Sequence, residues 1–216
     1  MVQTPALGAG GSQRFRSLLE DTYRRRSLVH LVPGSSVPLL RNQLWLVVRG
    51  MVKLGAITVH GDELLLGLAG PDQAFGEPLN DLETYAATTL CSTDLLCLSW
   101  AEIQGDHQLA VAILQIVSQR QRQSQALLAL MGLRRVEERV RGFLELLALD
   151  YGQPCERGLR LDLGMTHHEL ASALGTTRVT VTRVLGNLRD EGWLDSEGQR
   201  RLVLLSQPRA QPRRRP

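Results

Sequence analysis

The sequence contains few cysteines and few aromatic residues: 3 cysteines among 216 residues, and 4% Phe, Trp and Tyr. Cys91, Cys97 and Cys155 lack the spacing of metal ligands. Cys91 and Cys97 lie in an apolar, strand-like stretch, where free cysteines pack as small hydrophobic residues. We therefore expect no disulfide framework, no metal site and no cofactor.

Long hydrophobic runs are also absent. No apolar stretch is long enough to cross a bilayer. Residues 1–11 are small and polar, without the apolar centre of a signal peptide. These absences predict a soluble, cytoplasmic chain without a membrane partner.

Motifs of catalysis are missing as well. The sequence has no glycine-rich phosphate loop and no nucleophile motif of the G-x-S-x-G kind. The neighbours His167 and His168 would point about 100° apart on a helix, with no third metal ligand nearby in sequence. We therefore expect no catalytic residues, and an enzyme is the least favoured class of function.

What the chain does have is a concentration of arginine in its second half. The net charge is only +3, and 43% of the residues are hydrophobic, enough for one large core or two modest ones. Arginines dominate from Arg134 onward and end in the run Arg213–Arg215. Local basic charge of this kind favours nucleic acid as a partner. The basic tail, residues 209–216, either adds non-specific phosphate affinity or does nothing.

The first half has the pattern of a β domain. Residues 1–11 are predicted to be a flexible N-terminus, and residues 12–25 a short helix. Turn signals at Pro33-Gly34, Gly50, Gly61-Asp62 and Gly70-Pro71 then separate short apolar runs. The predicted strands are Leu28–Val32, Leu44–Val48, Val52–Val59, Leu64–Leu68, Tyr85–Leu90 and Leu95–Leu98. Many short strands at regular spacing predict a β-barrel or jelly roll over residues 12–106.

A long helix is predicted from His107 to about Met131, within a segment 107–132. One stripe of it advances in alternating steps of four and three residues, which is typical of a two-helix coiled coil. The predicted dimer interface consists of Leu109, Ile113, Ile116, Arg120, Gln123, Leu127 and Leu130. The alternative is a single amphipathic helix that packs on its own domain.

The remaining segment, residues 133–208, has the pattern of a winged helix-turn-helix. A helix is predicted over Val136–Leu149, and strands over Leu159–Leu163 and Arg201–Leu205. Between the strands, Thr166 and Glu169 form a capping-box pattern that begins a helix. Gly175 permits a sharp turn. Trp193 is interpreted as a core residue of the wing.

The second helix of this unit, residues 177–190, is the predicted DNA reader. Val181, Val184, Leu185 and Leu188 fall on one face and predict a buried stripe. The opposite face carries residues that suit bases and phosphates, as a recognition helix in the major groove does. The candidate DNA-binding residues are Arg178, Val179, Thr180, Thr182, Arg183, Thr166, His167, Thr177 and Arg189. The alternative is a solvated hairpin inside an unrelated bundle.

A β domain, a long helix and a C-terminal winged helix together resemble the Crp/Fnr superfamily of bacterial transcription regulators. The resemblance covers nearly the whole chain and implies an α+β fold with a cyclic-nucleotide-binding-like domain. From Glu138 to Leu205 the chain is most similar to the cyanobacterial global nitrogen regulators of the NtcA type. The stretches Asp150–Cys155 and Thr177–Arg183 carry this closer match.

The resemblance also implies partners. It implies a homodimer on double-stranded DNA, with RNA polymerase as a further partner. The positions of Arg178, Val179 and Arg183 read bases in the family. Val179 stands where the cyclic-AMP receptor protein has Glu, so palindromic half-sites resembling GTA…TAC are expected instead.

In the sensor half the sequence departs from the family. Residues 75–77 match the start of the family's phosphate-binding cassette, but the following segment, 78–87, contains no arginine. Pro78 removes a backbone donor, and Asp81 and Glu83 would oppose an anion. We therefore expect a degenerate pocket that does not bind cyclic nucleotide, and the identity of any effector stays open. The effector-pocket candidates are Phe75, Gly76, Glu77, Tyr85, Ser124 and Gln125.

A second hypothesis is a ligand-sensing or scaffold protein whose winged helix binds another protein without reading DNA. The basic face from Arg178 to Arg189 argues against it. DNA binding weakens steeply as salt rises, which distinguishes the two.

Overall fold

The structure is a computed structural model that describes residues 26–197 and 201–205. The predicted flexible segment 1–11, the predicted helix 12–25 and the basic tail 209–216 lie outside the described residues. Within the described part, no helix is both long and apolar enough to span a membrane.

The first half of the described chain consists of two facing β-sheets, confirming the expected jelly-roll-like α+β architecture. Its strands are β1 (Val29–Leu31), β2 (Gln43–Arg49), β3 (Val52–Ile57), β4 (Glu63–Ala69), β5 (Ala74–Phe75), β6 (Tyr85–Thr89) and β7 (Thr93–Ser99), with a short 3-10 helix η1 (Glu77–Leu79). One sheet has the order β1-β7-β2-β5 and the other β4-β3-β6. Within the described residues these are separate sheets, so the closed barrel is corrected to a sandwich.

Two helices follow the sheets: α2 (Trp100–Gly105) and α3 (His107–Met131). Ser99 and Glu102 form a capping box that begins α2. Asp106 caps the N-terminus of α3 by accepting hydrogen bonds from the backbone of Gln108 and Leu109. The predicted bounds of α3 are confirmed.

The face of α3 that was predicted to bind a second copy packs on its own chain instead. Leu109, Ile113 and Ile116 are buried in a core with residues of β2, β5 and β7. Leu127 is buried in the core that α3 shares with the second half of the molecule, and the partly buried Leu130 packs against the same core. The predicted dimer seam is thus corrected, because burying these side chains completes the core of one protomer.

Polar residues of the same face are also bound within the chain. Gln123 is 4% exposed, and its Oε1 accepts a 3.0 Å hydrogen bond from the backbone N–H of Leu68 in β4. Nη1 of Arg120 donates to the carbonyl oxygen of Ala74 in β5 over 3.3 Å. Neither side chain is available to a partner helix.

A different stripe of α3 faces solvent. It advances by the same alternating steps of three and four residues and is apolar towards both ends. We call it the outer stripe; it consists of Val111, Leu114, Ser118, Gln121, Gln125 and Leu128. Leu114 is 65% exposed and Leu128 is 74% exposed.

The second half of the described chain is a small α+β unit. It contains α4 (Val136–Tyr151), β8 (Gln153–Cys155), β9 (Gly158–Asp162), α5 (His167–Ala173), α6 (Arg178–Asp190), β10 (Leu194–Ser196) and β11 (Arg201–Leu205). Its sheet has the order β10-β11-β9-β8. The predicted pair of strands around residues 159–163 and 201–205 is confirmed, with Asp162 opposite Arg201.

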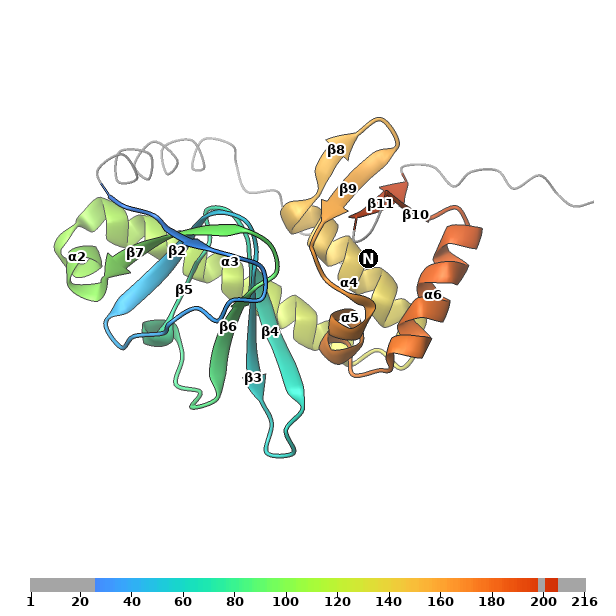
Figure 1. Cartoon of the computed structure of the whole chain (residues 1–216), viewed down its shortest axis with the longest axis horizontal. Coiled ribbons are helices and arrows are strands. Elements are labelled where there is room, and N and C mark those ends of the chain that lie inside the picture. The colour runs from blue at the N-terminus through green and yellow to red at the C-terminus, as the bar shows by residue number, and fades with distance from the viewer. Residues whose placement is uncertain (1–25, 198–200, 206–216) are drawn as a thin grey trace, which may run out of the picture.

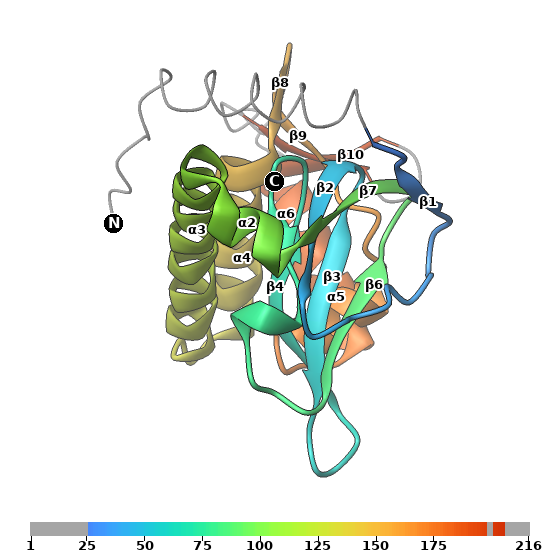
Figure 2. The ribbon, with the colours of Figure 1, turned by 90° about the vertical axis from the view of Figure 1, so that its left-hand side faces the viewer.

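Figure 1 places the two sheets of the sandwich on the left and the second half of the chain, with α5 and α6, on the right. In Figure 2, α3 and α4 stand side by side along one flank of the sandwich. One hydrophobic core joins the two halves, since Met51, Leu68 and Leu90 of the sandwich pack with Phe143 and Leu147 of α4. The helix-turn-helix therefore rests on the sandwich.

Candidate nucleic-acid interface

The first helix of the helix-turn-helix, α5, begins with the predicted capping box. The side chain of Thr166 accepts a 3.2 Å hydrogen bond from the backbone N–H of Glu169. The Glu169 carboxylate in turn accepts a 2.7 Å bond from the backbone N–H of Thr166. These reciprocal bonds satisfy two N–H groups that a helix start leaves unpaired and fix the first turn of α5.

The turn between the helices depends on Gly175, which has a φ of +58°. This left-handed conformation is easily adopted by glycine and is strained in most other residues. Thr177 then caps α6, because its Oγ1 accepts a 3.2 Å hydrogen bond from the backbone N–H of Thr180. Capping and turn chemistry thus set the angle at which α6 leaves α5.

The predicted buried stripe of α6 is confirmed. Val181, Val184, Leu185 and Leu188 are all buried in the core that also contains Leu170 of α5. A helix with four consecutive β-branched residues near its start, at positions 179–182, gains little from propensity, so this packing holds it.

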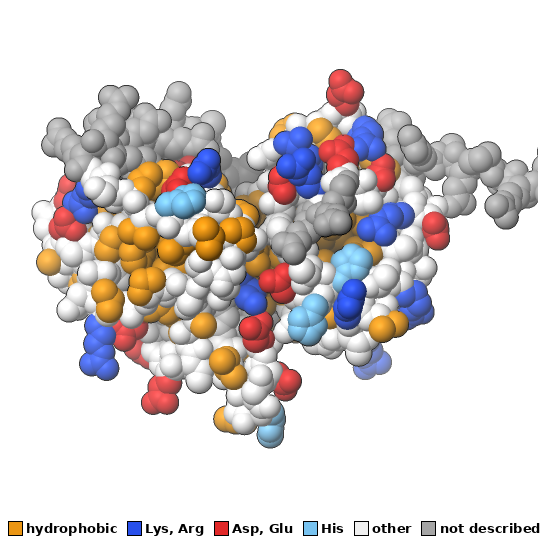
Figure 3. Space-filling model, viewed as in Figure 1, with side chains coloured by type: hydrophobic (Ala, Val, Ile, Leu, Met, Phe, Trp, Pro, Cys, Tyr) orange, Lys and Arg blue, Asp and Glu red, His pale blue; other side chains and the backbone are white. Residues whose placement is uncertain are grey.

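The opposite face of α6 is open to solvent. Arg178, Val179, Thr182 and Arg183 are exposed, and the Val179 side chain is 77% exposed. Figure 3 shows Arg and His side chains gathered over α5 and α6 on the face turned to the viewer. This face combines planar guanidinium donors with an aliphatic group that can contact a base methyl.

Other predicted DNA-binding residues have structural roles in the free protein. Thr166 and Thr177 are the caps of α5 and α6. Thr180 is half-buried, and its hydroxyl lies 2.9 Å from that of Thr177. Arg189 is half-buried, and its Nε is buried without a hydrogen-bond partner.

His167 connects the two helices. Its Nδ1 lies 2.9 Å from Oγ1 of Thr182 in α6. Burial, followed by the nearby charges of Arg189 and Arg178, lowers the pKa of the His167 imidazole below its ordinary value. The neutral imidazole is therefore favoured in the free protein.

The end of α6 and the start of the wing are fixed by one arginine of α4. Arg141 donates to the Glu191 carboxylate over 2.6 Å, and its guanidinium carbon lies 4.8 Å from the centroid of the Trp193 ring. Trp193 is half-buried against the core, as expected for a wing residue. Sequence reasoning missed Arg141, because no local signal marks a cation–π contact between distant segments.

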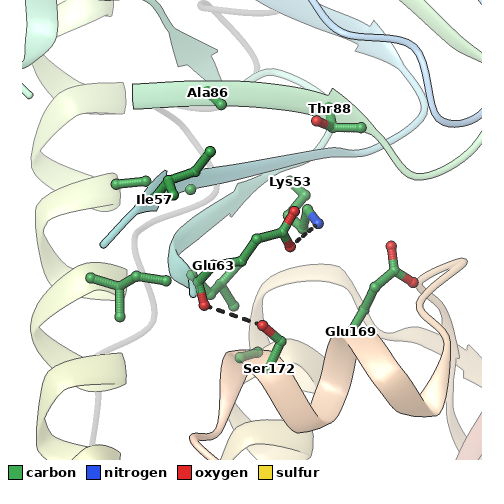
Figure 4. Close-up of a pocket in the computed structure, with 12 residues that line it drawn as sticks. Lys53, Ile57, Glu63, Ala86, Thr88, Glu169 and Ser172 are labelled. Carbon is green, nitrogen blue, oxygen red and sulfur yellow. Dashed lines mark hydrogen bonds and ion pairs between the residues drawn. The ribbon is translucent and has the colours of Figure 1, made fainter. Parts of the chain in front are cut away.

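The helix α5 also docks on the sandwich. Ser172 donates through Oγ to the carbonyl oxygen of Glu63 over 3.1 Å, and Lys53 pairs with the Glu63 carboxylate at 2.8 Å. Figure 4 shows these residues beside a small cavity, of about 60 Å³, between β3, β4, β6 and α5. Glu169 reaches its rim from α5.

The candidate effector residues are not brought to a single place. Phe75 is fully buried in the sandwich core, whereas Glu77 pairs with the exposed Arg41 at 3.5 Å. Gly76 has a φ of +154°, and a Cβ there would lie 2.7 Å from the carbonyl oxygen of Gln43. Gln125 belongs to the outer stripe.

Tyr85 and Ser124 lie instead where α3 meets the sheets. Oγ of Ser124 donates to the Leu66 carbonyl oxygen over 3.1 Å. Burial raises the pKa of Tyr85, and the adjacent Arg120 opposes the shift. The sequence analysis placed Arg120 in the predicted dimer interface. It did not predict that Arg120 lies beside Tyr85.

Comparison with known proteins identifies the helix-turn-helix. Residues 138–210 match the family model of the Crp-like helix-turn-helix domain. The chain is 31% identical over 159 residues to the regulatory protein CysR of Synechococcus elongatus, covering 72% of this chain and 73% of that protein. It is 31% identical over 191 residues to the global nitrogen regulator of Synechocystis sp., covering 83% and 81% of the two chains.

Solved structures agree with the fold. FixK2 of Bradyrhizobium japonicum superposes with a TM-score of 0.71 at 20% identity, over 82% of this chain and 91% of the other. The sequence identity and coverage of the relatives confirm the resemblance inferred from the sequence, and both relatives are regulators. The chain belongs to the Crp/Fnr family of transcription regulators, with a DNA-binding helix-turn-helix at its C-terminal end.

Proposed function

We propose that the chain acts as a homodimer whose two α6 helices read a palindromic operator with GTA…TAC-like half-sites. The observation that carries the proposal is the outer face of α6. Arg178 and Arg183 are exposed there, and neither guanidinium donates a hydrogen bond to a described residue. Both are therefore free to donate to guanine or to phosphate in a major groove.

The exposed face also bears on specificity. Val179 lies between the two arginines on the surface and has no polar atom in its side chain. It can contribute only apolar contact, such as contact with a thymine methyl group. The pairing of Arg178 with Val179 thus supports a half-site that differs from that of regulators with an acidic residue at this position.

We assign dimerisation to the outer stripe of α3. Its apolar members would otherwise remain exposed: Leu114 is 65% exposed and Leu128 is 74% exposed. The polar middle, at Ser118, Gln121 and Gln125, would set the register of two parallel helices. Two paired protomers would present their α6 helices to grooves about 34 Å apart, one turn of B-DNA.

We further propose that the sandwich does not respond to cyclic nucleotides. The segment 78–87, which follows the matching part of the cassette, contains no arginine, and Arg120 directs Nη1 at the carbonyl oxygen of Ala74. An anionic ligand would have to displace that bond to reach the Arg120 guanidinium. Binding a phosphate without further donors is unfavourable in a partly buried site.

The test is a mobility-shift titration of the full chain on a palindromic duplex and on a scrambled duplex. Replacing Arg178 by Ala should cost about 1–3 kcal/mol on the palindrome and relax discrimination. Arg41→Ala is the matched control, because Arg41 is also exposed to solvent but lies in the first half of the chain, just before β2. An unchanged ratio of the two affinities in Arg178→Ala would refute the reading role, and insensitivity to salt would favour a protein partner instead.

A further inference from the structure

His167 occupies a special position in the helix-turn-helix. It is the first residue of α5, and its ring is half-buried against α6. It lines a hollow of about 260 Å³ between α5, α6 and the wing, together with Thr166, Arg189 and Arg201. Cationic side chains from α6 and β11 thus line the same hollow as the imidazole.

The hydrogen bonds around Thr182 determine which ring nitrogen of His167 carries the proton. The hydroxyl of Thr182 donates its single proton to the carbonyl oxygen of Arg178 over 2.9 Å. In this arrangement its oxygen accepts from Nδ1 of His167, which lies 2.9 Å away. In the neutral imidazole Nε2 then has no proton and can only accept a hydrogen bond.

The charges facing the ring favour that neutral form before DNA binds. Arg178 and Arg189 approach from α6, and Arg201 lines the same hollow from β11 while pairing with Asp162 at 3.2 Å. On α5 itself, the Glu169 carboxylate is held in the capping box by Thr166. No acidic group among these described neighbours is free to stabilise an imidazolium.

We propose that His167 takes up a proton from solvent when DNA binds and donates through Nε2 to a backbone phosphate. This inference rests on the proposed function, because it requires α6 to enter the major groove beside that phosphate. The lone pair of a neutral Nε2 would face the phosphate oxygens and repel them. The imidazolium donates a charge-assisted hydrogen bond and adds a positive charge.

The direction in which pH changes the DNA affinity follows from the difference between the pKa of His167 in the free protein and in the complex. Burial and the arginines lower the pKa of the free His167, whereas an adjacent phosphate raises it in the complex. Proton uptake then strengthens DNA binding as the pH falls between the two values. Histidine titrates between about pH 5 and 8, so operator affinity of the dimer should rise about tenfold or more from pH 8 to pH 6.

The experiment measures the affinity of the full chain for the palindromic duplex by fluorescence anisotropy, from pH 8 to pH 6 at constant ionic strength. Wild type and His168→Gln should bind more tightly as the pH falls; His168 is the exposed neighbour and the matched control. His167→Gln should have a flat profile. His167→Arg should be flat as well but tight at pH 8, which separates loss of the proton from loss of the fold.

Two results would overturn the proposal while leaving the proposed function intact. One is a palindrome-specific His167→Gln variant with the pH profile of wild type. The other is a nitrogen-15 NMR spectrum of the free wild-type protein in which neutral His167 is protonated on Nε2. Failure of wild type to discriminate palindrome from scrambled duplex at any pH would instead refute the proposed function.

Discussion

The amide of Gln123 donates through Nε2 to the hydroxyl of Tyr151 over 2.8 Å, which ties the middle of α3 to the last turn of α4. The same Nε2 donates to the Asp150 carboxylate over 2.7 Å. Tyr151 also lies 2.8 Å from the carbonyl oxygen of Leu68 and 2.7 Å from Oε1 of Gln73. The sandwich, α3 and the segment that leads into the winged helix therefore meet in one buried polar network.

Replacing Gln123 by Ala should destabilise the protein by about 2–4 kcal/mol, because it leaves the N–H of Leu68 and the partners on α4 unpaired in a buried site. Denaturant unfolding measures the change. Gln115→Ala is the matched control, since Gln115 is exposed on the same helix and lies outside the outer stripe, and it should change stability by less than about 0.5 kcal/mol. Equal effects of the two variants would contradict the role of the network.

Asp150 gives the network a pH dependence. Burial raises the pKa of Asp150, and the hydrogen bond from Gln123 partly opposes it. A raised pKa in the folded state means that the stabilising contribution is present at low pH and is lost as the pH rises through that value. Asp150→Asn keeps an acceptor oxygen without the charge, so its melting temperature at pH 7 should be higher than that of wild type.

The advantage of Asp150→Asn should shrink as the pH falls through the raised pKa of Asp150, because the native carboxyl then becomes protonated as well. Thermal melts between pH 4 and pH 7 check this, with Glu145→Gln as the control because Glu145 is an exposed carboxylate on the same helix. If the melting temperatures of Asp150→Asn and wild type differed by the same amount at every pH, the charge of Asp150 would not be the cause of the difference.

The outer stripe of α3 is tested by Leu114→Glu. Burying a leucine contributes about 1.5–3 kcal/mol, and a symmetric dimer loses this twice, so its dissociation constant should rise about 100-fold or more. Sedimentation velocity measures the oligomeric state. Leu149→Glu is the matched control, since Leu149 is 73% exposed on α4; a dimeric Leu114→Glu protein would refute the assignment.

The sandwich should give no heat of binding with cyclic AMP or cyclic GMP in calorimetric titrations of the wild-type protein. The reason is the absence of arginine from residues 78–87 and the bond between Arg120 and Ala74. Micromolar binding of either nucleotide would overturn the proposal. Arg120→Gln would then decide whether the guanidinium is the binding group, since Gln keeps a donor without the charge.

Local chemistry made the helix-turn-helix predictable from the sequence. The capping box at Thr166, the left-handed Gly175 and the buried stripe of α6 each depend on residues close together in the chain. The same capping signal at Ser99 and Glu102 could have located α2, which the sequence reading overlooked. Strands such as β5 and β8 are too short to have a recognisable period, and β8 contains Pro154.

The features that could not be predicted from the sequence depend on packing between residues far apart in the chain. The two stripes of α3 both advance in steps of three and four residues, so spacing alone could not assign the inner one, with Leu109 and Ile113, to the protomer's own core. The place of Arg120 beside Tyr85 likewise depends on how the sandwich folds against α3. Contacts between residues far apart in the chain set these features.

The inner side of α3 completes the core of a single chain, so a protomer owes its folded state to its own residues. Dilution would then separate folded subunits rather than unfold them. At concentrations far below the dissociation constant, the concentration of dimers varies with the square of the total protein concentration. With the proposed dimer as the DNA-bound form, a twofold change in protein concentration would change the occupancy of an unsaturated operator more than twofold.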